Sequence, residues 1–514
     1  MSQAWNEGYF TDVGYTFGYY REINPVFQRF CLLLNGFSAP APKGEIYHCE
    51  LGFGQGVSVN IHAAANPGQY IATDFNPAHA AHAQRLAQAA GSDARLYDDS
   101  FEQLLNRNDL PQFDSISLHG IWTWVSRDNH RIITEFIRRH LKPGGICFVS
   151  YNCFPGWAPF YPLRQLFALH DRFVTGSSAA VPRVEAALKF SQDLLAANPN
   201  YCLAVPLLPE KLKSIAEGDR HYLAHEYFNR DWNCMYFTDV VDTLTPAKLE
   251  WGCAATPLDK VDAANLRADA QVFLATIEHP VLREQARDYF INQQFRKDIF
   301  LRGINRMTAA QQQDALLETR LVLMKIAADV PMTMKGAVGE VTLQEDLYRP
   351  FIDVLAADHY RPKTLRTVLA QIPPMPWPHL MQMLAILLHL DAIAPCHDED
   401  TQQQVRQRCK TLNRHLCERA RQSSEIVFLA NPATGGGINV HRFGQLFLLA
   451  REHGKKQPTE WAHFAWQILA AQNERIVKDG KALDTHEENL AEMTRQADEF
   501  NDKMMPILKA LQVV

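Results

Sequence analysis

The first 160 residues alternate between short apolar segments and helical segments, and this alternation constrains the fold more than any other feature. The strand candidates are residues 45–51, 69–75, 94–99, 113–120 and 145–152, and helical segments such as 76–91 and 127–141 separate them. This order predicts right-handed crossovers and a doubly wound, mostly parallel sheet, which is an α/β fold of the Rossmann-like kind. Ligands of such sheets bind beyond the carboxyl ends of the strands.

The first strand candidate runs into a turn that carries glycine at alternate positions. The segment "ELGFGQG" places Gly52, Gly54 and Gly56 behind Glu50. Glycine lets the backbone approach a ligand without an intervening Cβ, and a helix that starts there offers free N–H groups to polar or anionic groups. The spacing differs from the GxGxxG dinucleotide fingerprint and lacks the GK[ST] of a phosphate loop. The turn by itself therefore predicts a ligand site without naming the ligand.

Polar side chains follow the later strands. Asp74 and Phe75 end the second strand, Asp99 and Ser100 end the third, and "LHGIW" with His119 closes the fourth. A carboxylate at the second strand end can accept both hydroxyls of a ribose. The third strand end is well placed for an adenine amino group. Each residue also has a structural interpretation: Asp74 and Asp99 can cap the helices that follow, and Glu50 can be a surface acid.

Together these features resemble the class I S-adenosylmethionine-dependent methyltransferases. The resemblance implies S-adenosyl-L-methionine as cofactor and S-adenosyl-L-homocysteine as product. It assigns the methionine end of the cofactor to Glu50, Gly52, Gly54 and Gly56, the ribose to Asp74, and the adenine to Asp99 and Ser100. Phe75 and His119 are expected to border the same ligand. A carboxylate and aromatic faces also suit the sulfonium cation.

Four further segments resemble a narrower group. They are "GYFTDVGYTFGYYREINP", "SLHGIWTWVS", "SYNCFPGWAPFYPLR" and "HEYFNRDWNCMYFTDVV". These are similar to bacterial methyltransferases with a methyltransferase regulatory domain, a group that includes the rickettsial protein-lysine methyltransferases acting on outer-membrane proteins. The resemblance implies a catalytic domain followed by additional domains, one of them a winged helix.

The pattern along the chain predicts four parts. Residues 1–160 and 222–304 are expected to form the methyltransferase domain, in which two late strand candidates rejoin the first sheet. Residues 161–221 read as a helical insertion that serves substrate binding or homodimer formation. Residues 305–397 fit a winged-helix-like module or a small helical packing domain, and residues 398–514 form a mainly helical C-terminal domain. In that last part we interpret "NPATGGGINV" as a turn between two short strands, because no Lys-Ser/Thr follows it.

Methyl transfer is an in-line displacement at carbon, so the enzyme aligns the acceptor, excludes water and removes a proton where needed. The residues expected to do this are Tyr151, Asn152 and His119, although His119 also fits a core histidine. Aromatic side chains that could roof the acceptor are Tyr9, Tyr19, Trp122, Tyr227 and Trp232. For the N-terminal tyrosines, packing within a lid is the alternative.

Composition limits the partners and the compartment. The net charge of −6 and the isoelectric point of 6.4 argue against a nucleic-acid-binding protein. The ten cysteines form no CxxC pair, the N-terminus lacks a signal-peptide pattern, and no apolar run is long enough to span a bilayer. We therefore expect a cytoplasmic protein without a membrane span, and the sequence shows no metal-ligand spacing.

Three functions remain in competition. The first is methylation of a protein, on lysine nitrogen, with the C-terminal half holding the protein substrate. The second is methylation of a small molecule or a surface saccharide. The third is a regulator that binds S-adenosylmethionine without turnover. Nucleic acid is not expected as a partner, since the strand-four motif of base methyltransferases is replaced by "LHGI".

Overall fold

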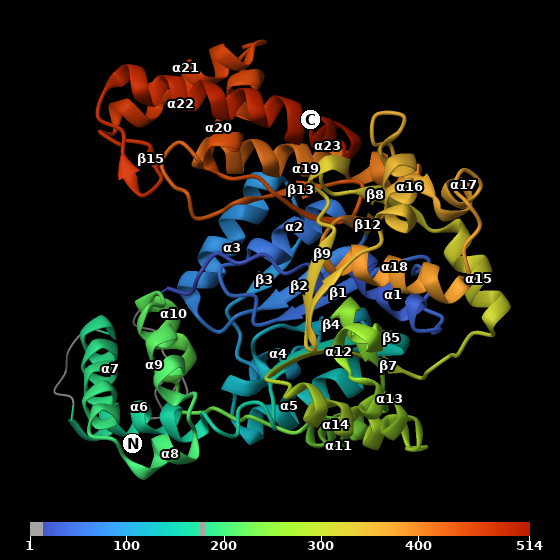
Figure 1. Cartoon of the computed structure of the whole chain (residues 1–514), viewed down its shortest axis with the longest axis vertical. Helices are drawn as coiled ribbons and strands as arrows, with labels where there is room; N and C mark the ends of the chain where they lie inside the picture. The colour runs from blue at the N-terminus through green and yellow to red at the C-terminus, as the bar shows by residue number, and fades with distance from the viewer. Residues whose placement is uncertain (1–13, 175–179) are drawn as a thin grey trace.

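A computed structural model describes residues 14–174 and 180–514. Its centre is a seven-stranded sheet in the order β3-β2-β1-β4-β5-β7-β6, shown in Figure 1. Strands β1 to β5 are parallel, and β7 runs antiparallel to both β5 and β6. The predicted doubly wound sheet is confirmed, and the late strands complete it. The strands are β1 (Tyr47–Leu51), β2 (Gln69–Thr73), β3 (Arg95–Tyr97), β4 (Phe113–Leu118), β5 (Leu141–Asn152), β6 (Leu249–Ala254) and β7 (Phe295–Arg302).

The crossover helices begin where the sequence supplies capping side chains. Asn76 caps α3 and Ser126 caps α5, while Ser100 forms a capping box with Gln103 at the start of α4. The caps are therefore neither Asp74 nor Asp99, and the capping interpretation of those two carboxylates is wrong. The helices are α1 (Pro25–Leu34), α2 (Val57–Ala65), α3 (Pro77–Ala90), α4 (Phe101–Leu105) and α5 (Arg127–His140).

One face of the sheet buries its apolar side chains against α5. Ile71, Ile116 and Val149 from three strands pack in one cluster with Ile133 and Phe136 of that helix. The alternation of apolar residues along each strand puts the intervening side chains on the opposite face. The strand ends, which carry the polar residues, are thereby fixed by a rigid core.

Five helices between β5 and β6 form a lobe of their own beside the sheet (Figure 1). Its core contains Trp157, Phe167, Leu212 and Trp232. The last helix begins after Asp219, whose side chain accepts from the Tyr222 amide. The helices are α6 (Tyr161–Val174), α7 (Ala180–Ala196), α8 (Asn200–Ala204), α9 (Leu208–Ala216) and α10 (Arg220–Tyr227). Helices α11 (Phe237–Leu244), α12 (Asp262–Asn265), α13 (Ala268–Ala275) and α14 (Pro280–Ile291) follow around β6 and β7.

The C-terminal part contains two further helical regions. The first combines a three-stranded sheet, in the order β11-β8-β12, with a β-hairpin and four helices. Its elements are α15 (Ala309–Glu318), β8 (Arg320–Leu323), β9 (Thr333–Gly336), β10 (Gly339–Thr342), α16 (Glu345–Ala356), β11 (Lys363–Thr364), α17 (Leu365–Leu369), α18 (Trp377–His389) and β12 (Ile393–Pro395).

The second region packs on the helices α2 and α3, which cover one face of the sheet, through its own helix α19. "NPATGGGINV" spans the turn between β13 and β14, as the sequence predicted, and Tyr19 packs against Gly437 there. No helix in the described ranges is both long and apolar enough to cross a membrane. The elements are α19 (Glu399–Arg419), β13 (Phe428–Asn431), β14 (Gly436–Asn439), α20 (Arg442–Glu452), α21 (Pro458–Ala471), β15 (Val477–Lys478), β16 (Lys481–Ala482), α22 (His486–Glu499) and α23 (Met505–Ala510).

Candidate active site

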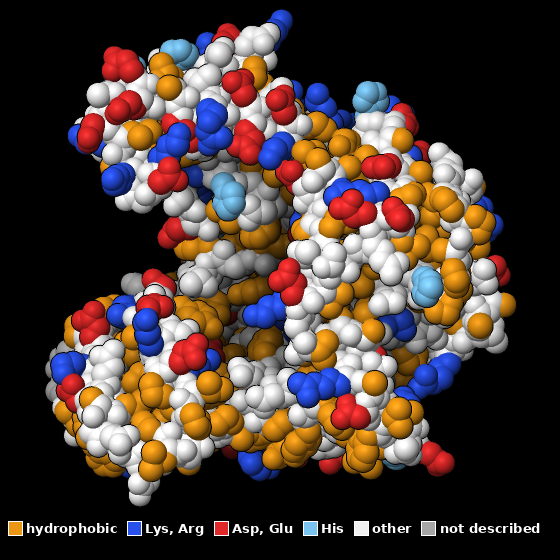
Figure 2. Space-filling view, in the orientation of Figure 1, with side chains coloured by type: hydrophobic (Ala, Val, Ile, Leu, Met, Phe, Trp, Pro, Cys, Tyr) orange, Lys and Arg blue, Asp and Glu red, His pale blue; other side chains and the backbone are white. Residues whose placement is uncertain are grey.

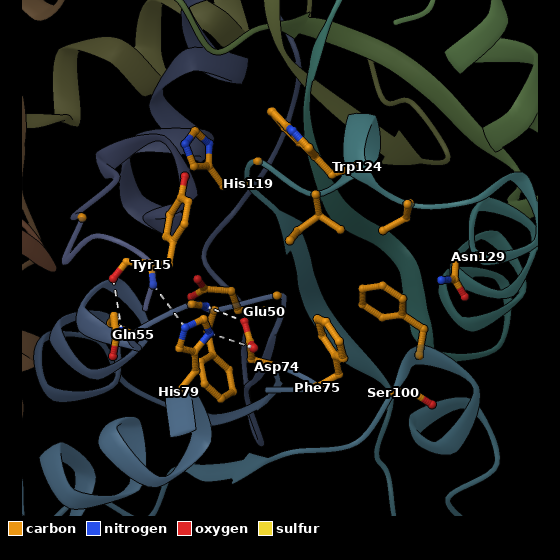
Figure 3. A pocket seen from close by; sticks show the side chains of 18 of the residues that line it. Tyr15, Glu50, Gln55, Asp74, Phe75, His79, Ser100, His119, Trp124 and Asn129 are labelled. Carbon is orange, nitrogen blue, oxygen red and sulfur yellow. Dashed lines mark hydrogen bonds and ion pairs between the residues drawn. The ribbon is translucent and has the colours of Figure 1, made fainter. Parts of the chain in front are cut away.

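A pocket lies at the carboxyl ends of β1 to β4, where a doubly wound sheet places its ligand (Figure 3). The N-terminal segment 14–20 forms another wall of this pocket. Among the residues predicted to bind the cofactor, those that line it are Glu50, Gly52, Gly54, Asp74, Phe75, Asp99, Ser100 and His119. Gly56 does not line the pocket. It precedes α2 with φ of 75°, and a Cβ there would lie 2.3 Å from the Cβ of Ala83.

The glycine turn has no room for a side chain at Gly52. Gly52 has φ of 77°, and a Cβ on it would lie 2.1 Å from Cδ1 of Ile121. Gly54 has φ of 56°, again in the left-handed region that favours glycine. The turn therefore presents bare backbone to the pocket, as close approach of a ligand requires.

Asp74 ties this turn to the end of β2. Its Oδ2 accepts a hydrogen bond from the Gly54 amide at 2.8 Å, and its Oδ1 contacts Nδ1 of His79 at 3.1 Å. Nε2 of His79 accepts from the Tyr15 amide at 3.4 Å, so Nδ1 carries the proton and donates to Asp74. Gln55 donates to the Tyr15 carbonyl at 3.1 Å. These bonds hold the N-terminal segment across the pocket (Figure 3).

Glu50 is a buried carboxyl at the end of β1 and is 7 % exposed. Burial, together with repulsion from the nearby Asp74 carboxylate, raises the pKa of Glu50 to about 8. A cation bound beside Glu50 would favour the ionised form of that carboxyl. The buried acid pair thus fits the sulfonium and ammonium groups of S-adenosylmethionine, and the bare turn fits its methionine end.

The third strand end is arranged differently from the first two. The Asp99 carboxylate pairs with Arg107 at 2.9 Å, and Ser100 is the cap of α4. Both residues line the pocket, and Phe75 and Phe101 line it beside them. This end of the pocket offers aromatic faces and backbone groups for a planar ring.

His119 stands at the opposite end of the pocket. Its Nδ1 lies 3.1 Å from Oγ of Ser150, and its ring centroid lies 3.8 Å from that of Tyr20. Burial lowers the pKa of His119 to about 4, so the ring is neutral near pH 7. A neutral histidine between two hydroxyl-bearing residues orients other groups and carries no charge itself.

The structure does not bring Tyr151 to the pocket. Its side chain is fully buried in the core, and its hydroxyl donates to Oδ2 of Asp298 at 2.7 Å. Because side chains alternate along β5, Tyr151 points to the opposite face from Ser150 and Asn152. The catalytic role predicted for Tyr151 is corrected to a structural one.

Asn152 lies on the same face of β5 as Ser150, outside the lining of the pocket. Its backbone amide donates to Oγ1 of Thr123 at 2.8 Å, and its side-chain oxygen accepts from Trp157 at 3.2 Å. Its side-chain nitrogen lies 3.4 Å from Oε1 of Glu226. Asn152 therefore connects the fourth and fifth strand ends to α10.

Four of the predicted acceptor-binding residues also lie outside the pocket. Trp122 is fully buried and stacks on His130, because the short helix Trp122–Trp124 turns its first side chain into the core. Tyr19 packs between His62 and Phe428 rather than over the pocket. Tyr227 and Trp232 both pack on Trp157 in the core of the helical lobe. Tyr9 lies outside the described residues.

The neighbours of those residues line the pocket instead. Tyr20 and Trp124 do so, and so do Tyr15, His79 and Asp231. The sequence motifs contain all of them except His79, which lies in the helix after the second strand, but only the backbone phase decides which of two nearby aromatic residues faces the ligand. Glu226 was missed altogether, because nothing local in "HEYFNRDW" reveals that α10 packs against the end of β5.

Comparisons with known proteins agree with this geometry. A family model described as a methyltransferase domain matches residues 49–145, and one described as a predicted methyltransferase regulatory domain matches residues 219–302. An uncharacterized protein of Synechocystis sp. is 37% identical over 514 residues, covering 99% of this chain and 100% of that protein. An uncharacterized protein of Rickettsia prowazekii is 26% identical over 208 residues, which is 40% of this chain and 80% of that protein.

Among solved structures, PKMT2 from Rickettsia typhi in complex with AdoHcy has the same fold. The TM-score is 0.69 at 18% sequence identity, with 97% of this chain and 100% of that chain covered. The likeness therefore extends beyond the catalytic sheet into the helical lobe and the C-terminal regions.

The fold, the glycine turn and the family model define an S-adenosylmethionine-dependent methyltransferase. More narrowly, the chain belongs to the family of such methyltransferases that carry a methyltransferase regulatory domain.

Proposed function

We propose that the protein transfers a methyl group from S-adenosylmethionine to the side-chain nitrogen of lysine in a protein substrate. The observation that carries the proposal is the charge of the pocket. Its described lining includes the acidic side chains of Glu50, Asp74, Asp99 and Asp231, of which Asp99 pairs with Arg107, and it includes no lysine or arginine. Such a lining attracts cations and disfavours phosphates and other anionic acceptors.

Aromatic side chains complete this environment. Tyr15, Tyr20 and Trp124 line the pocket together with the carboxylates. Aromatic faces and carboxylates attract a lysine ammonium, and partial burial favours the neutral amine that attacks the methyl group. S-adenosylmethionine supplies the methyl group when it is bound. The side chains of this protein bind it, align the amine and exclude water.

Two further features favour a macromolecular acceptor. Figure 2 shows an open cleft between the lobe of α7–α10 and the lobe of α20–α22, and this cleft offers a surface for a macromolecular acceptor. PKMT2, which shares the fold along nearly the whole chain, carries in its name the activity of a protein methyltransferase.

The test uses S-adenosylmethionine labelled on its methyl group, the purified protein and a cell lysate separated into protein, glycan and small-molecule fractions. The proposal expects label in discrete proteins, stable to mild base. Label confined to the glycan or small-molecule fraction would support the second function considered from the sequence. Cofactor binding without any transfer would support the regulator instead.

A further inference from the structure

The first helix of the region matched by the regulatory-domain model lies against the candidate active site. Helix α10 contacts the N-terminal segment, because the ring of His225 lies 5.2 Å from the ring of Tyr15 in an edge-on arrangement. Tyr15 lines the pocket and is held there by His79 and Gln55. The helix therefore packs against a residue that lines the pocket, and it is also part of the helical lobe.

Glu226 is the acidic residue that this helix presents towards the end of β5. It is half-buried, and its Oε1 lies 3.4 Å from the side-chain nitrogen of Asn152. The hydroxyl of Tyr222, one turn earlier on the same helix, also donates to the Glu226 carboxylate. Tyr222 in turn lies near Tyr20, which borders the pocket beside His119. Glu226 does not line the pocket itself. It lies next to Asn152, which is two residues along β5 from Ser150, and Ser150 contacts His119 at that end of the pocket.

The surroundings of Glu226 favour its protonation. Burial raises the pKa of Glu226 to about 7, outweighing the lowering by Asn152, Tyr222, Lys211 and Arg164. The two cations are engaged elsewhere: Lys211 lies over the Trp157 ring at 5.3 Å, and Arg164 lies over the Trp232 ring at 5.4 Å. A carboxyl group that titrates near neutral pH is suited to exchange protons with a substrate.

We propose that Glu226 accepts the proton that the acceptor ammonium must lose before methyl transfer, with Asn152 and Tyr222 holding the carboxylate in place. This inference rests on the proposed function, because an amine acceptor is what requires such a group. A lysine ammonium has a pKa near 10.4, so about one side chain in 2,500 is neutral at pH 7. A proton acceptor at the site raises that fraction.

Atoms and electrons balance in this step. The ammonium gives one proton to the Glu226 carboxylate and becomes a neutral amine. The nitrogen lone pair then forms the bond to the methyl carbon, and the carbon–sulfur bond breaks with its electron pair remaining on sulfur. The product is a methylated ammonium, and the Glu226 carboxyl afterwards releases its proton to solvent.

The first experiment compares the full-length wild-type protein with Glu226→Gln, which keeps the size and hydrogen-bonding capacity of the side chain. Methyllysine is measured after acid hydrolysis of labelled lysate proteins. We expect Glu226→Gln to lower the rate at pH 7 by about 100-fold or more, with S-adenosylmethionine affinity unchanged. Glu217→Gln, an exposed position in the same lobe, is the matched control and should retain the wild-type rate.

The pH profile separates this role from a merely structural one. The wild-type rate should fall on acidification through about pH 7, because the protonated carboxyl cannot accept a proton. The Glu226→Gln rate should instead rise about tenfold per pH unit in the alkaline range, following solution deprotonation of the amine. A wild-type rate and profile in Glu226→Gln would overturn the proposal.

A second measurement does not depend on turnover. Infrared difference spectra between wild type and Glu226→Gln report the protonation of this carboxyl, and n-butylamine with S-adenosylhomocysteine imitates a lysine side chain at the site. The amine should lower the titration midpoint of Glu226. An unchanged midpoint would overturn the inference. Label found only on acceptors other than lysine would overturn the proposed function. The role of Glu226 would then be decided by whether n-butylamine lowers its titration midpoint.

Discussion

The carboxylate of Asp74 accepts a hydrogen bond from the Gly54 amide across an N···O distance of 2.8 Å. One side chain at the end of β2 thereby fixes the turn that follows β1, and its other oxygen contacts His79, which holds the N-terminal segment. The conformation of the turn and the position of this segment depend on the same residue.

Replacing Asp74 should therefore weaken cofactor binding more than the loss of one contact would. Asp74→Ala removes a charge and the bonds to Gly54 and His79. We expect S-adenosylmethionine affinity to fall by about 30- to 100-fold, equivalent to 2–3 kcal/mol. Isothermal titration calorimetry measures this affinity. The control is Asp98→Ala, which changes an exposed aspartate at the end of β3. Equal affinities of both variants would remove Asp74 from the site.

Gly52 and Gly44 allow a matched test of the bare turn. Both have φ of 77°, but a Cβ at Gly52 would meet Ile121 at 2.1 Å, whereas nothing lies within 4 Å at Gly44. Backbone strain is common to Gly52→Ala and Gly44→Ala, so only the steric conflict differs. We expect Gly52→Ala to lose cofactor binding and Gly44→Ala to keep it. Binding retained in both variants would show that the turn does not need bare backbone.

Cofactor affinity should depend on the protonation of Glu50. Its pKa of about 8 means that the free protein holds the carboxyl mostly protonated at pH 7, and a bound cation favours the ionised form. Binding should therefore release protons, and affinity should increase as the pH rises from about 6.5 to 8.5. Calorimetry in buffers of different ionisation enthalpy measures the released protons. S-adenosylmethionine has titrating groups of its own, so the Glu50→Gln variant serves as the reference for their contribution. If the affinity of Glu50→Gln depends on pH in the same way as that of the wild type, Glu50 is not the group responsible.

Tyr151→Phe should affect stability and leave catalysis unchanged. The hydroxyl bonds to a buried carboxylate that Arg296 also contacts. Its loss should cost about 1–3 kcal/mol and lower the midpoint of thermal unfolding. The turnover and cofactor affinity of Tyr151→Phe should match those of the wild type. The control is Tyr289→Phe, at an exposed position, whose stability should also match that of the wild type. A large fall in turnover without loss of stability would restore Tyr151 to the catalytic group.

The sheet and the cofactor end of the site were predictable because their determinants are local. Each strand is a short apolar run, and the residues directly after it, such as Asp74 and Phe75, share one edge of a parallel sheet by topology alone. The glycine spacing after β1 is also local, and it is sufficient to predict the turn.

The acceptor side was not predictable in the same way. Trp122 and Trp124 differ only in the phase of a short helix, and Tyr19 and Tyr20 differ in whether they face Phe428 or His119. Glu226 reaches the end of β5 across 74 positions of sequence, through the packing of a lobe whose orientation no local pattern encodes.

The most direct test of the account is to identify the atom that receives the methyl group. Mass spectrometry of proteins labelled by the purified enzyme, followed by fragmentation, assigns the modified side chain. We predict methyl groups on lysine nitrogen, in much smaller amounts when Asp74→Ala replaces the wild-type enzyme at the same S-adenosylmethionine concentration. Methyl groups found only on a saccharide, a small metabolite or a residue other than lysine would contradict it.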